Sequence, residues 1–145
     1  MDIPSYLSGI IFTRATRILR ANVSNALSAH NLTPTKWSFL GTVMQAPDGI
    51  RLVSVAKQLG SKAPQITAIA QELADRGFVQ RLPHHSDGRA KLLIMTPQGK
   101  QFVQAVEKDV EQQLVRLLDG LTDADLLTYK KVLETIIRNG TADAA

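Results

Sequence analysis

The 145-residue sequence contains no cysteine. This absence excludes disulfides, thiolate catalysis, a cysteine redox switch and zinc sites built on cysteine. No apolar run approaches the roughly 18 residues of a membrane-spanning helix, and the first residues lack the basic and apolar regions of a secretory signal. We therefore expect a cytoplasmic protein with no membrane partner.

The composition is that of a globular chain. Hydrophobic residues make up 44% of the sequence and charged residues 21%, values that exclude a disordered chain or a coiled-coil rod. A chain of this length buries about 70% of the surface that its unfolded form exposes, so it forms a core without disulfides or metals. The length predicts one ordinary domain, or one domain with helical extensions, over residues 1–145.

Charge is distributed unevenly along the chain. Residues 51–100 contain eight Lys or Arg against three Asp or Glu, a net charge of +5. Residues 1–50 carry +2, and residues 101–145 carry −3. A basic middle segment with an acidic C-terminal one is typical of a domain that binds a polyanion, and we expect that polyanion to be nucleic acid.

The first third of the chain predicts two helices. From about Ser5 to His30, apolar residues recur at helical spacing, with the arginines largely off that stripe. Thr33 is suited to cap a second helix that begins at Pro34, because proline lacks only an amide that would be unpaired there. The turn cluster at residues 46–49 ends that helix, and residues 50–52 form at most a stub strand.

The middle of the chain predicts two more helices joined by a very short turn. The first covers about residues 52–59 and is closed by Gly60. The second opens at Ser61 or Lys62 and is ended by Gly77. Its apolar positions have the spacing of a buried stripe: Ile66, Ile69, Ala70 and Leu73. Two helices joined in this way cross at a steep angle, which is the helix-turn-helix arrangement.

The periodicity changes after the second of these helices. Residues 78–82 and 91–95 are short apolar runs. They flank a polar segment, residues 83–90, so together they predict a β-hairpin with a long basic tip. A helix-turn-helix followed by such a hairpin is a winged helix, complete at about residues 34–100.

Two helices are expected after the hairpin. Thr96 and Pro97 repeat the capped-proline start and predict a long helix to about Asp119. Thr122 is expected to cap the last helix, with Asp125 three residues later as a variant of the capping box.

The helices outside the winged region, residues 1–30 and 101–140, carry apolar stripes that one small domain cannot fully cover. Pairing the first and last helices of two chains would give a twofold homodimer, so we expect these to be dimerisation helices. Such a dimer presents two recognition helices about 34 Å apart and predicts a pseudo-palindromic operator. The alternative is a helical bundle satisfied within one chain. The fold class is mainly α: a winged helix-turn-helix domain of three helices and a β-hairpin wing, with N- and C-terminal dimerisation helices.

Short motifs extend through residues 59–100. They are Leu59-Gly60, Ile66-Thr67, Leu73, Arg76-Gly77-Phe78-Val79, Arg81, Asp87-Gly88-Arg89 and Met95-Thr96-Pro97-Gln98-Gly99-Lys100. With the upstream segment Leu32–Leu40, they make the chain resemble the MarR family of winged-helix transcriptional regulators over nearly its whole length. The wing motif, Asp-x-Arg followed by a strand and Met-Thr-x-x-Gly, is the most specific part of the resemblance.

The outward face of the second helix of the helix-turn-helix can hydrogen-bond base edges. Its residues are Lys62, Gln65, Thr67, Ala68 and Gln71. Gln65 and Gln71 can pair bidentately with adenine, and Lys62 suits guanine or a phosphate. The Thr67 methyl can contact thymine. Ala68 departs from the resemblance, since relatives often have arginine there, so we expect one contact fewer. The alternative interpretation is a solvated helix face.

The hairpin tip is the sharper candidate site. Arg89 can reach a minor groove, where narrow A·T stretches concentrate negative potential. A carboxylate is repelled by phosphate, so we expect Asp87 to pair with Arg89 or accept backbone amides and hold the tip in shape. Arg81 and Lys91, on the two strands, are expected to contact phosphates. The alternative is a solvated hairpin with an ordinary turn.

The resemblance also implies a small aromatic or phenolic effector, which binds between the dimerisation helices and the winged region and weakens DNA binding. The corresponding residues here are Phe12, Arg14, His30, Trp37 and Met44. For Trp37, an ordinary place in the core is the alternative. A ligand releases DNA only by binding a state whose recognition helices no longer match successive grooves.

Metal, cofactor and catalytic sites are not expected. His84 and His85 are adjacent in an extended segment and point to opposite sides, without a third clustered histidine. Glu107, Asp109 and Glu111 form a charge run typical of a solvated helix face. The sequence also contains no glycine-rich phosphate loop and no Gly-x-Ser-x-Gly motif, so we expect no enzyme.

We therefore interpret the chain as a homodimeric transcriptional repressor that binds double-stranded DNA. The first rival is a winged-helix module that binds protein or RNA, which predicts no sequence-dependent affinity for DNA. The second is a small enzyme on a helical dimer, disfavoured because no acid–base or nucleophile grouping is present.

Overall fold

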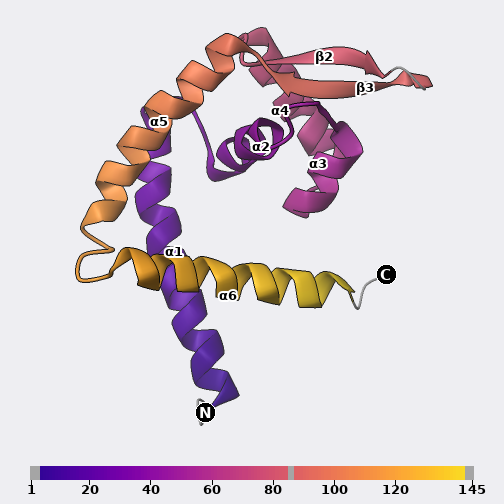
Figure 1. Ribbon diagram of the computed structural model, residues 1–145. Helices are drawn as coiled ribbons and strands as arrows, with labels where there is room; N and C mark the ends of the chain where they lie inside the picture. The colour runs from indigo at the N-terminus through magenta and orange to yellow at the C-terminus, as the bar shows by residue number, and fades with distance from the viewer. Residues whose placement is uncertain (1–3, 85–86, 143–145) are drawn as a thin grey trace. The chain divides into compact units, whose positions relative to one another are not determined.

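A computed structural model describes residues 4–84 and 87–142, with the side chains of residues 84–91 and 142 outside the description. Six helices and three strands follow one another along these residues (Figure 1). In chain order they are α1 (Ser5–Ser28), α2 (Pro34–Met44), β1 (Ile50–Arg51), α3 (Leu52–Leu59), α4 (Ala63–Asp75), β2 (Val79–His84), β3 (Asp87–Met95), α5 (Pro97–Val115) and α6 (Asp123–Ala142). Residues 1–114 and residues 115–145 form two compact units.

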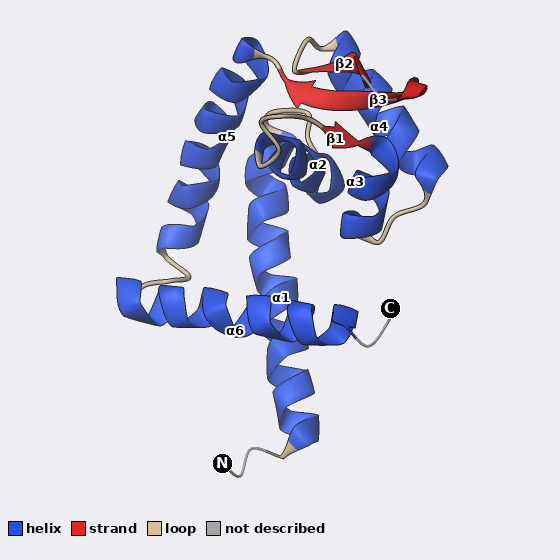
Figure 2. Cartoon of the chain, turned by 45° about the vertical axis from the view of Figure 1, so that its right-hand side comes forward, coloured by secondary structure: helices blue, strands red, loops and turns tan. Residues whose placement is uncertain are grey.

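The three strands form one antiparallel sheet in the order β1-β3-β2. Ile50 of β1 pairs with Leu93 of β3, and Val79 of β2 pairs with Met95. The sheet contacts α2 and α3 through β3, and it contacts α4 through β2 (Figure 2). Helix-turn-helix, hairpin and stub strand therefore form the predicted winged helix.

The core of the first unit lies where α2, α3 and α4 meet the sheet. Its largest fully buried side chains are Leu27, Phe39, Leu40, Val43, Val55, Ile66, Leu73, Leu93 and Val106. Burying each of these side chains stabilises the fold by about 1.5–3 kcal/mol. The stripe predicted for α4 is confirmed, because Ile66, Ile69, Ala70 and Leu73 are all buried.

Two of the predicted helix boundaries, the start of α2 and the end of α3, depend on local capping, and the structure confirms both. The Thr33 hydroxyl accepts a hydrogen bond from the Lys36 amide at 3.2 Å, directly before Pro34 opens α2. Gly60 ends α3 with a φ of 59°, a left-handed conformation that costs glycine little.

The start of α5 is seated on the backbone where the wing begins. The Thr96 hydroxyl donates to the Gly77 carbonyl at 2.6 Å and accepts from the Gly99 amide at 2.9 Å. Gly99 is buried, and a Cβ atom on it would overlap the carbonyl of Phe78. Only glycine lets the first turn of α5 approach β2 this closely.

The second unit consists mainly of α6, and its first turn confirms the predicted capping box. The Thr122 hydroxyl and amide donate to the Asp125 carboxylate at 2.7 Å and 2.8 Å, and the Asp125 amide donates back to the hydroxyl at 3.2 Å. These bonds favour the charged carboxylate, the hydroxyl more than the amide, and hold the pKa of Asp125 below its ordinary value of 3.8.

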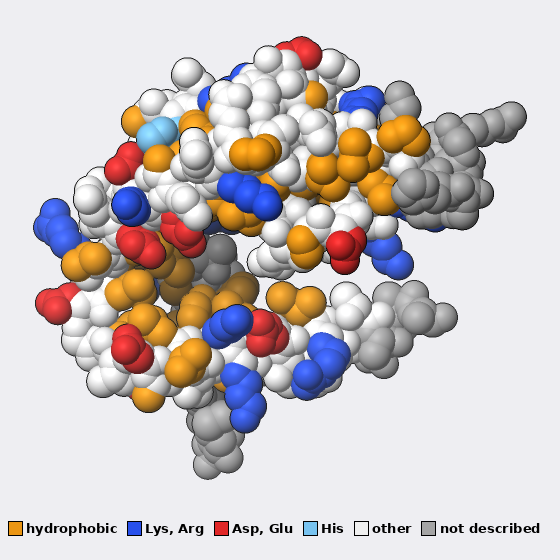
Figure 3. Space-filling model, turned by 45° about the horizontal axis from the view of Figure 1, so that its top comes forward, with side chains coloured by type: hydrophobic (Ala, Val, Ile, Leu, Met, Phe, Trp, Pro, Cys, Tyr) orange, Lys and Arg blue, Asp and Glu red, His pale blue; other side chains and the backbone are white. Residues whose placement is uncertain are grey.

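Large hydrophobic side chains remain exposed on two helices. On α1 they are Tyr6, Leu7, Ile10, Ile11, Phe12 and Ile18, and on α6 they are Leu127, Tyr129, Val132, Ile136 and Ile137. Figure 3 shows hydrophobic side chains at the surface among charged ones. Isolated exposed apolar residues are ordinary, but a row of them along one helix marks an interaction surface.

Three predicted boundaries are wrong. The hairpin strands were expected over residues 78–82 and 91–95, but β2 runs to His84 and β3 begins at Asp87. Most of the expected polar tip is therefore strand, because the pairing of Pro83 with Lys91 and of His84 with Asp87 continues past the apolar residues, with a register shift between Pro83 and His84. Helix α5 ends at Val115 rather than Asp119, and the chain then turns through Gly120 with a φ of 84°. Over the described ranges, the helices are too short or too polar to cross a lipid bilayer.

Candidate nucleic-acid interface

Helix α4 exposes the side chains predicted to face DNA. Gln65, Thr67, Ala68 and Gln71 are all exposed, and Lys62 is exposed as the residue that precedes the first turn. The opposite side of α4 is occupied by its buried stripe, so this outward face is left uncovered by the described residues. It has the polar surface and the rigid support that reading a major groove requires.

Two of these side chains are already engaged along the helix. The Thr67 hydroxyl donates to the Ala63 carbonyl at 2.9 Å. The Gln71 amide donates to the Asp75 carboxylate at 2.9 Å, one turn further on. Gln71 must therefore turn away from Asp75 before it can pair bidentately with adenine. This role of Asp75 was not predicted from the sequence, although its i+4 spacing from Gln71 on the helix indicates that the two side chains can meet.

The wing is an antiparallel hairpin next to α4 in the chain. The backbone places Asp87, Arg89 and Lys91 on β3, with Asp87 paired to His84 and Lys91 paired to Pro83. The side chains of all three lie outside the described part of the structure, so their expected DNA contacts stay predictions. His84 and His85 also lie outside the described side chains.

Arg81 lies on β2 opposite Leu93, on the same side of the strand as buried Val79. Its Nε and Nη2 atoms are buried and have no hydrogen-bond partner in the described part of the chain. A phosphate contact by Arg81 stays a prediction.

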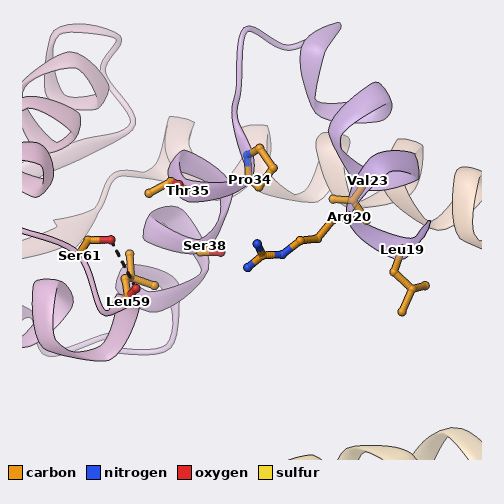
Figure 4. A pocket seen from close by; sticks show the side chains of 8 residues that line it. All are labelled: Leu19, Arg20, Val23, Pro34, Thr35, Ser38, Leu59 and Ser61. Atoms are coloured by element: carbon orange, nitrogen blue, oxygen red, sulfur yellow. Dashed lines mark hydrogen bonds between the residues drawn. The ribbon is translucent and has the colours of Figure 1, made fainter. Parts of the chain in front are cut away.

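A cavity of about 300 Å³ lies between α1, α2 and the end of α3. It is lined by Leu19, Arg20, Val23, Pro34, Thr35, Ser38, Leu59 and Ser61. Figure 4 shows the Arg20 side chain extending from α1 toward Ser38. The Ser61 hydroxyl is held by the Leu59 carbonyl at 3.4 Å. The cavity thus combines an apolar wall with one guanidinium.

The five residues predicted to bind an effector do not line this cavity. Phe12 and Arg14 are exposed on α1, whereas Trp37 and Met44 are half-buried against the core. His30 follows α1 and bonds to Asp109 of α5 at 2.6 Å. These five side chains therefore have different environments: two are exposed, two pack against the core, and His30 is bonded to α5.

The arginine that lines the cavity is Arg20, whereas the sequence analysis named Arg14 for the effector site. Arg20 precedes Val23 by three residues and Leu27 by seven, so it lies on the side of α1 that packs on the winged unit. This spacing was available in the sequence and would have distinguished Arg20 from Arg14 and Arg17.

The sequence is similar to a known protein family and to a named repressor. The family model described as MarR family matches residues 32–91. The HTH-type transcriptional repressor Rv2887 of Mycobacterium tuberculosis is 27% identical over 128 residues, which are 88% of this chain and 91% of that protein.

Three solved structures share the fold. Rv2887 in complex with salicylic acid has a TM-score of 0.69 and 27% identity, over 93% of this chain and 97% of that one. CouR from Rhodococcus jostii RHA1, bound to p-coumaroyl-CoA, has a TM-score of 0.78 and 25% identity, over 94% and 95%. A cysteine-to-serine mutant of MarR from E. coli, complexed with operator DNA, has a TM-score of 0.71 and 22% identity, over 88% and 91%.

Proposed function

We propose that this chain is a member of the MarR family, a ligand-responsive transcriptional repressor that binds a pseudo-palindromic DNA operator as a homodimer. The exposed polar face of α4 above a fully buried stripe carries the proposal. A helix of this kind enters a major groove without disturbing its own domain. Such a regulator acts on the chromosome, so the proposal includes a cytoplasmic location.

In this proposal the winged region, residues 34–100, divides the contacts between two elements. Gln65, Thr67 and Gln71 read base edges in the major groove, and Lys62 binds guanine or a phosphate. Ala68 lets the helix approach without adding a hydrogen bond. The wing supplies the second set of contacts, with Arg89 in the minor groove and Asp87 shaping the tip. Arg81 and Lys91 bind phosphates, which position the domain without reading sequence.

The homodimer follows from the exposed apolar faces of α1 and α6. Tyr6, Ile11 and Phe12 on α1 are at least half exposed, as are Ile136 and Ile137 on α6. Covering these residues with the same faces of a second copy would bury them in a twofold interface. The two copies of α4 would then contact two half-sites one helical turn apart.

Binding-site selection from random duplexes, followed by footprinting, tests the proposal. We expect a pseudo-palindromic site whose affinity falls steeply with salt, because Lys and Arg release counterions from phosphates. Arg89→Ala should weaken operator binding about tenfold to a hundredfold without changing the melting temperature, since Arg89 lies on the wing. Lys108→Ala on exposed α5 is the matched control. Binding without sequence preference, or with a flat salt response, would favour the module that binds protein or RNA.

We propose that the effector occupies the cavity beside Arg20. Leu19, Val23 and Leu59 offer an apolar wall for a ring, and the Arg20 guanidinium can pair with a carboxylate. The bound salicylic acid of Rv2887 has this chemistry, an aromatic ring with a carboxylate. Small aromatic carboxylates and phenols are therefore the expected class.

Titration with salicylate tests the cavity, because Trp37 is the single tryptophan and lies on α2, which also lines the cavity. We expect the fluorescence of Trp37 to change and operator DNA to be released in the same concentration range. Arg20→Met should weaken salicylate binding at least tenfold, while Arg17→Met, a change on exposed α1, should not. Equal binding by both variants would place the effector elsewhere.

A further inference from the structure

One arginine at the end of α4 contacts both the turn between α1 and α2 and helix α5. Arg76 follows the last residue of α4 and is its C-cap. Its guanidinium donates two hydrogen bonds, from Nη2 to the His30 carbonyl at 2.8 Å and from Nη1 to the Asn31 carbonyl at 3.1 Å. Both carbonyls belong to the turn between α1 and α2, where Asn31 has a positive φ of 53°. Arg76 therefore joins the end of α4 directly to the end of α1.

The same guanidinium lies against two stacked rings. Its carbon is 4.9 Å from the centre of the Phe78 ring and 5.4 Å from that of Phe102. The two rings are 4.0 Å apart and nearly parallel, at 10°. Phe78 directly precedes β2 and Phe102 lies in α5, so one side chain contacts the base of the wing and the long helix together.

Acidic groups complete this cluster on two sides. Glu72, one turn before Arg76 on α4, binds Lys36 of α2 at 2.7 Å and lies 4.0 Å from the Arg76 guanidinium. On the other side, His30 meets the Phe102 ring edge-on at 6.0 Å and bonds to Asp109 of α5 at 2.6 Å. Among the described residues, the side-chain hydrogen bonds between α4 and the turn after α1 all come from Arg76.

We propose that Arg76 is a positioning residue for DNA binding: it fixes the angle of α4 relative to α1 and α5 and thereby sets the separation of the two recognition helices in the dimer. This inference rests on the proposed function and assigns a role to a cation that does not itself face DNA. The two terminal nitrogens of the guanidinium donate to backbone carbonyls, and the guanidinium also lies against the rings of Phe78 and Phe102. The planar fork suits this task, because lysine cannot reproduce two parallel bonds together with stacking.

The length of α4 makes its angle critical. A helix of 13 residues is about 20 Å long, at 1.5 Å per residue. A tilt of about 10° about the Arg76 end therefore moves the other end by about 3 Å, close to the 3.4 Å between successive base pairs. Loss of the Arg76 contacts thus changes which half-site spacing the dimer accepts.

The test measures spacing discrimination rather than affinity alone. Wild-type protein, Arg76→Ala and Arg76→Lys are titrated against the selected operator and against duplexes with one base pair inserted or deleted between the half-sites. We expect the wild type to lose at least tenfold in affinity on either change and Arg76→Ala to lose less than threefold. Arg76→Lys should behave like Arg76→Ala although it keeps the charge. Lys108→Ala, which removes one exposed positive charge from α5, should discriminate like the wild type.

The ratio of affinities for the different half-site spacings separates a positioning role of Arg76 from a simple loss of stability. Partial unfolding would lower the affinity for every spacing by the same factor and leave this ratio unchanged. Wild-type discrimination that persists unchanged in Arg76→Ala and Arg76→Lys would overturn the inference and leave the proposed function intact. A wild-type protein without any sequence-dependent binding would instead overturn the proposed function.

A second measurement does not need DNA and also serves if Arg76→Ala fails to fold. The chain has no cysteine, so Ala68→Cys provides a single spin-label site on the exposed side of α4. In the dimer this label gives one distance between the two recognition helices. We expect a narrow distance distribution in the otherwise wild-type background and a broader or displaced one with Arg76→Lys. Identical distributions would overturn the inference.

Discussion

Helices α4 and α6 are both amphipathic, but their apolar side chains meet opposite surroundings. In α4, Ile66 and Leu73 are completely buried, whereas in α6 Ile136 and Ile137 are 60% and 64% exposed. The apolar stripe of α4 is satisfied inside its own chain, so its outward face is available for recognition. The stripe of α6 lies in a unit of residues 115–145, which is too small to provide a core of its own. An apolar stripe in a sequence therefore specifies burial, and only the fold tells whether the same chain provides it.

The largest effect is expected where α4 meets the core. Ile66→Ala should lower the free energy of unfolding by about 2–5 kcal/mol, because it removes a buried side chain and leaves a cavity. The loss should not depend on protein concentration, since the site is buried within one chain. Denaturant titration at two concentrations, with exposed Thr67→Ala as the control, measures it. A concentration-dependent loss would show that α4 also needs a second copy.

A smaller loss of stability but a clear loss of assembly is expected on α6. Ile136→Glu should shift the protein from dimer to monomer and weaken operator binding about a hundredfold, because a charge cannot be buried unpaired in an apolar interface. Sedimentation velocity and operator titration measure the two effects. Thr128→Glu, at an exposed position of the same helix, controls for the added negative charge. A dimer that survives Ile136→Glu would remove this part of α6 from the interface.

The smallest effect concerns how the two helices begin. In α6 the pKa of Asp125 is lowered by its bonds to Thr122, so the cap contributes stability above the ordinary value of 3.8 and loses it as the pH falls through the lower folded value. In α4 the corresponding residue, Lys62, makes no side-chain cap. When hydrogen exchange is measured at pH 5 and at pH 3, the amides in the first turn of α6 should therefore be less protected at pH 3, and those in the first turn of α4 should not. Asp125→Asn should remove the difference, and equal changes in both helices would contradict it.

The parts of the fold that depend on local signals could be predicted from the sequence. Helix α3 ends at Gly60 because a left-handed residue is needed there, and α2 starts at Pro34 because Thr33 caps it. The strands were predicted too short, since the pairing of His84 with Asp87 is made by backbone atoms and leaves no apolar pattern. Backbone pairing at a hairpin tip becomes visible only in the structure.

The candidate site was predictable on α4 and less so elsewhere. The outward residues of α4 follow from helical periodicity once Ile66 and Leu73 are placed inside. Arg76 carries no such signal, because its partners His30 and Asn31 are 46 and 45 residues away in the chain. The cavity beside Arg20 combines residues of three helices, which no single periodicity brings together.

The close approach at Gly99 affects how movements travel through the winged unit. Where side chains meet, rotation about their bonds absorbs small shifts, but here the first turn of α5 rests directly on the peptide of Phe78. The hydroxyl of Thr96 bonds both partners at the same corner. We therefore expect a displacement of α5 to move the base of the hairpin as well, so that the two elements move as one rigid body.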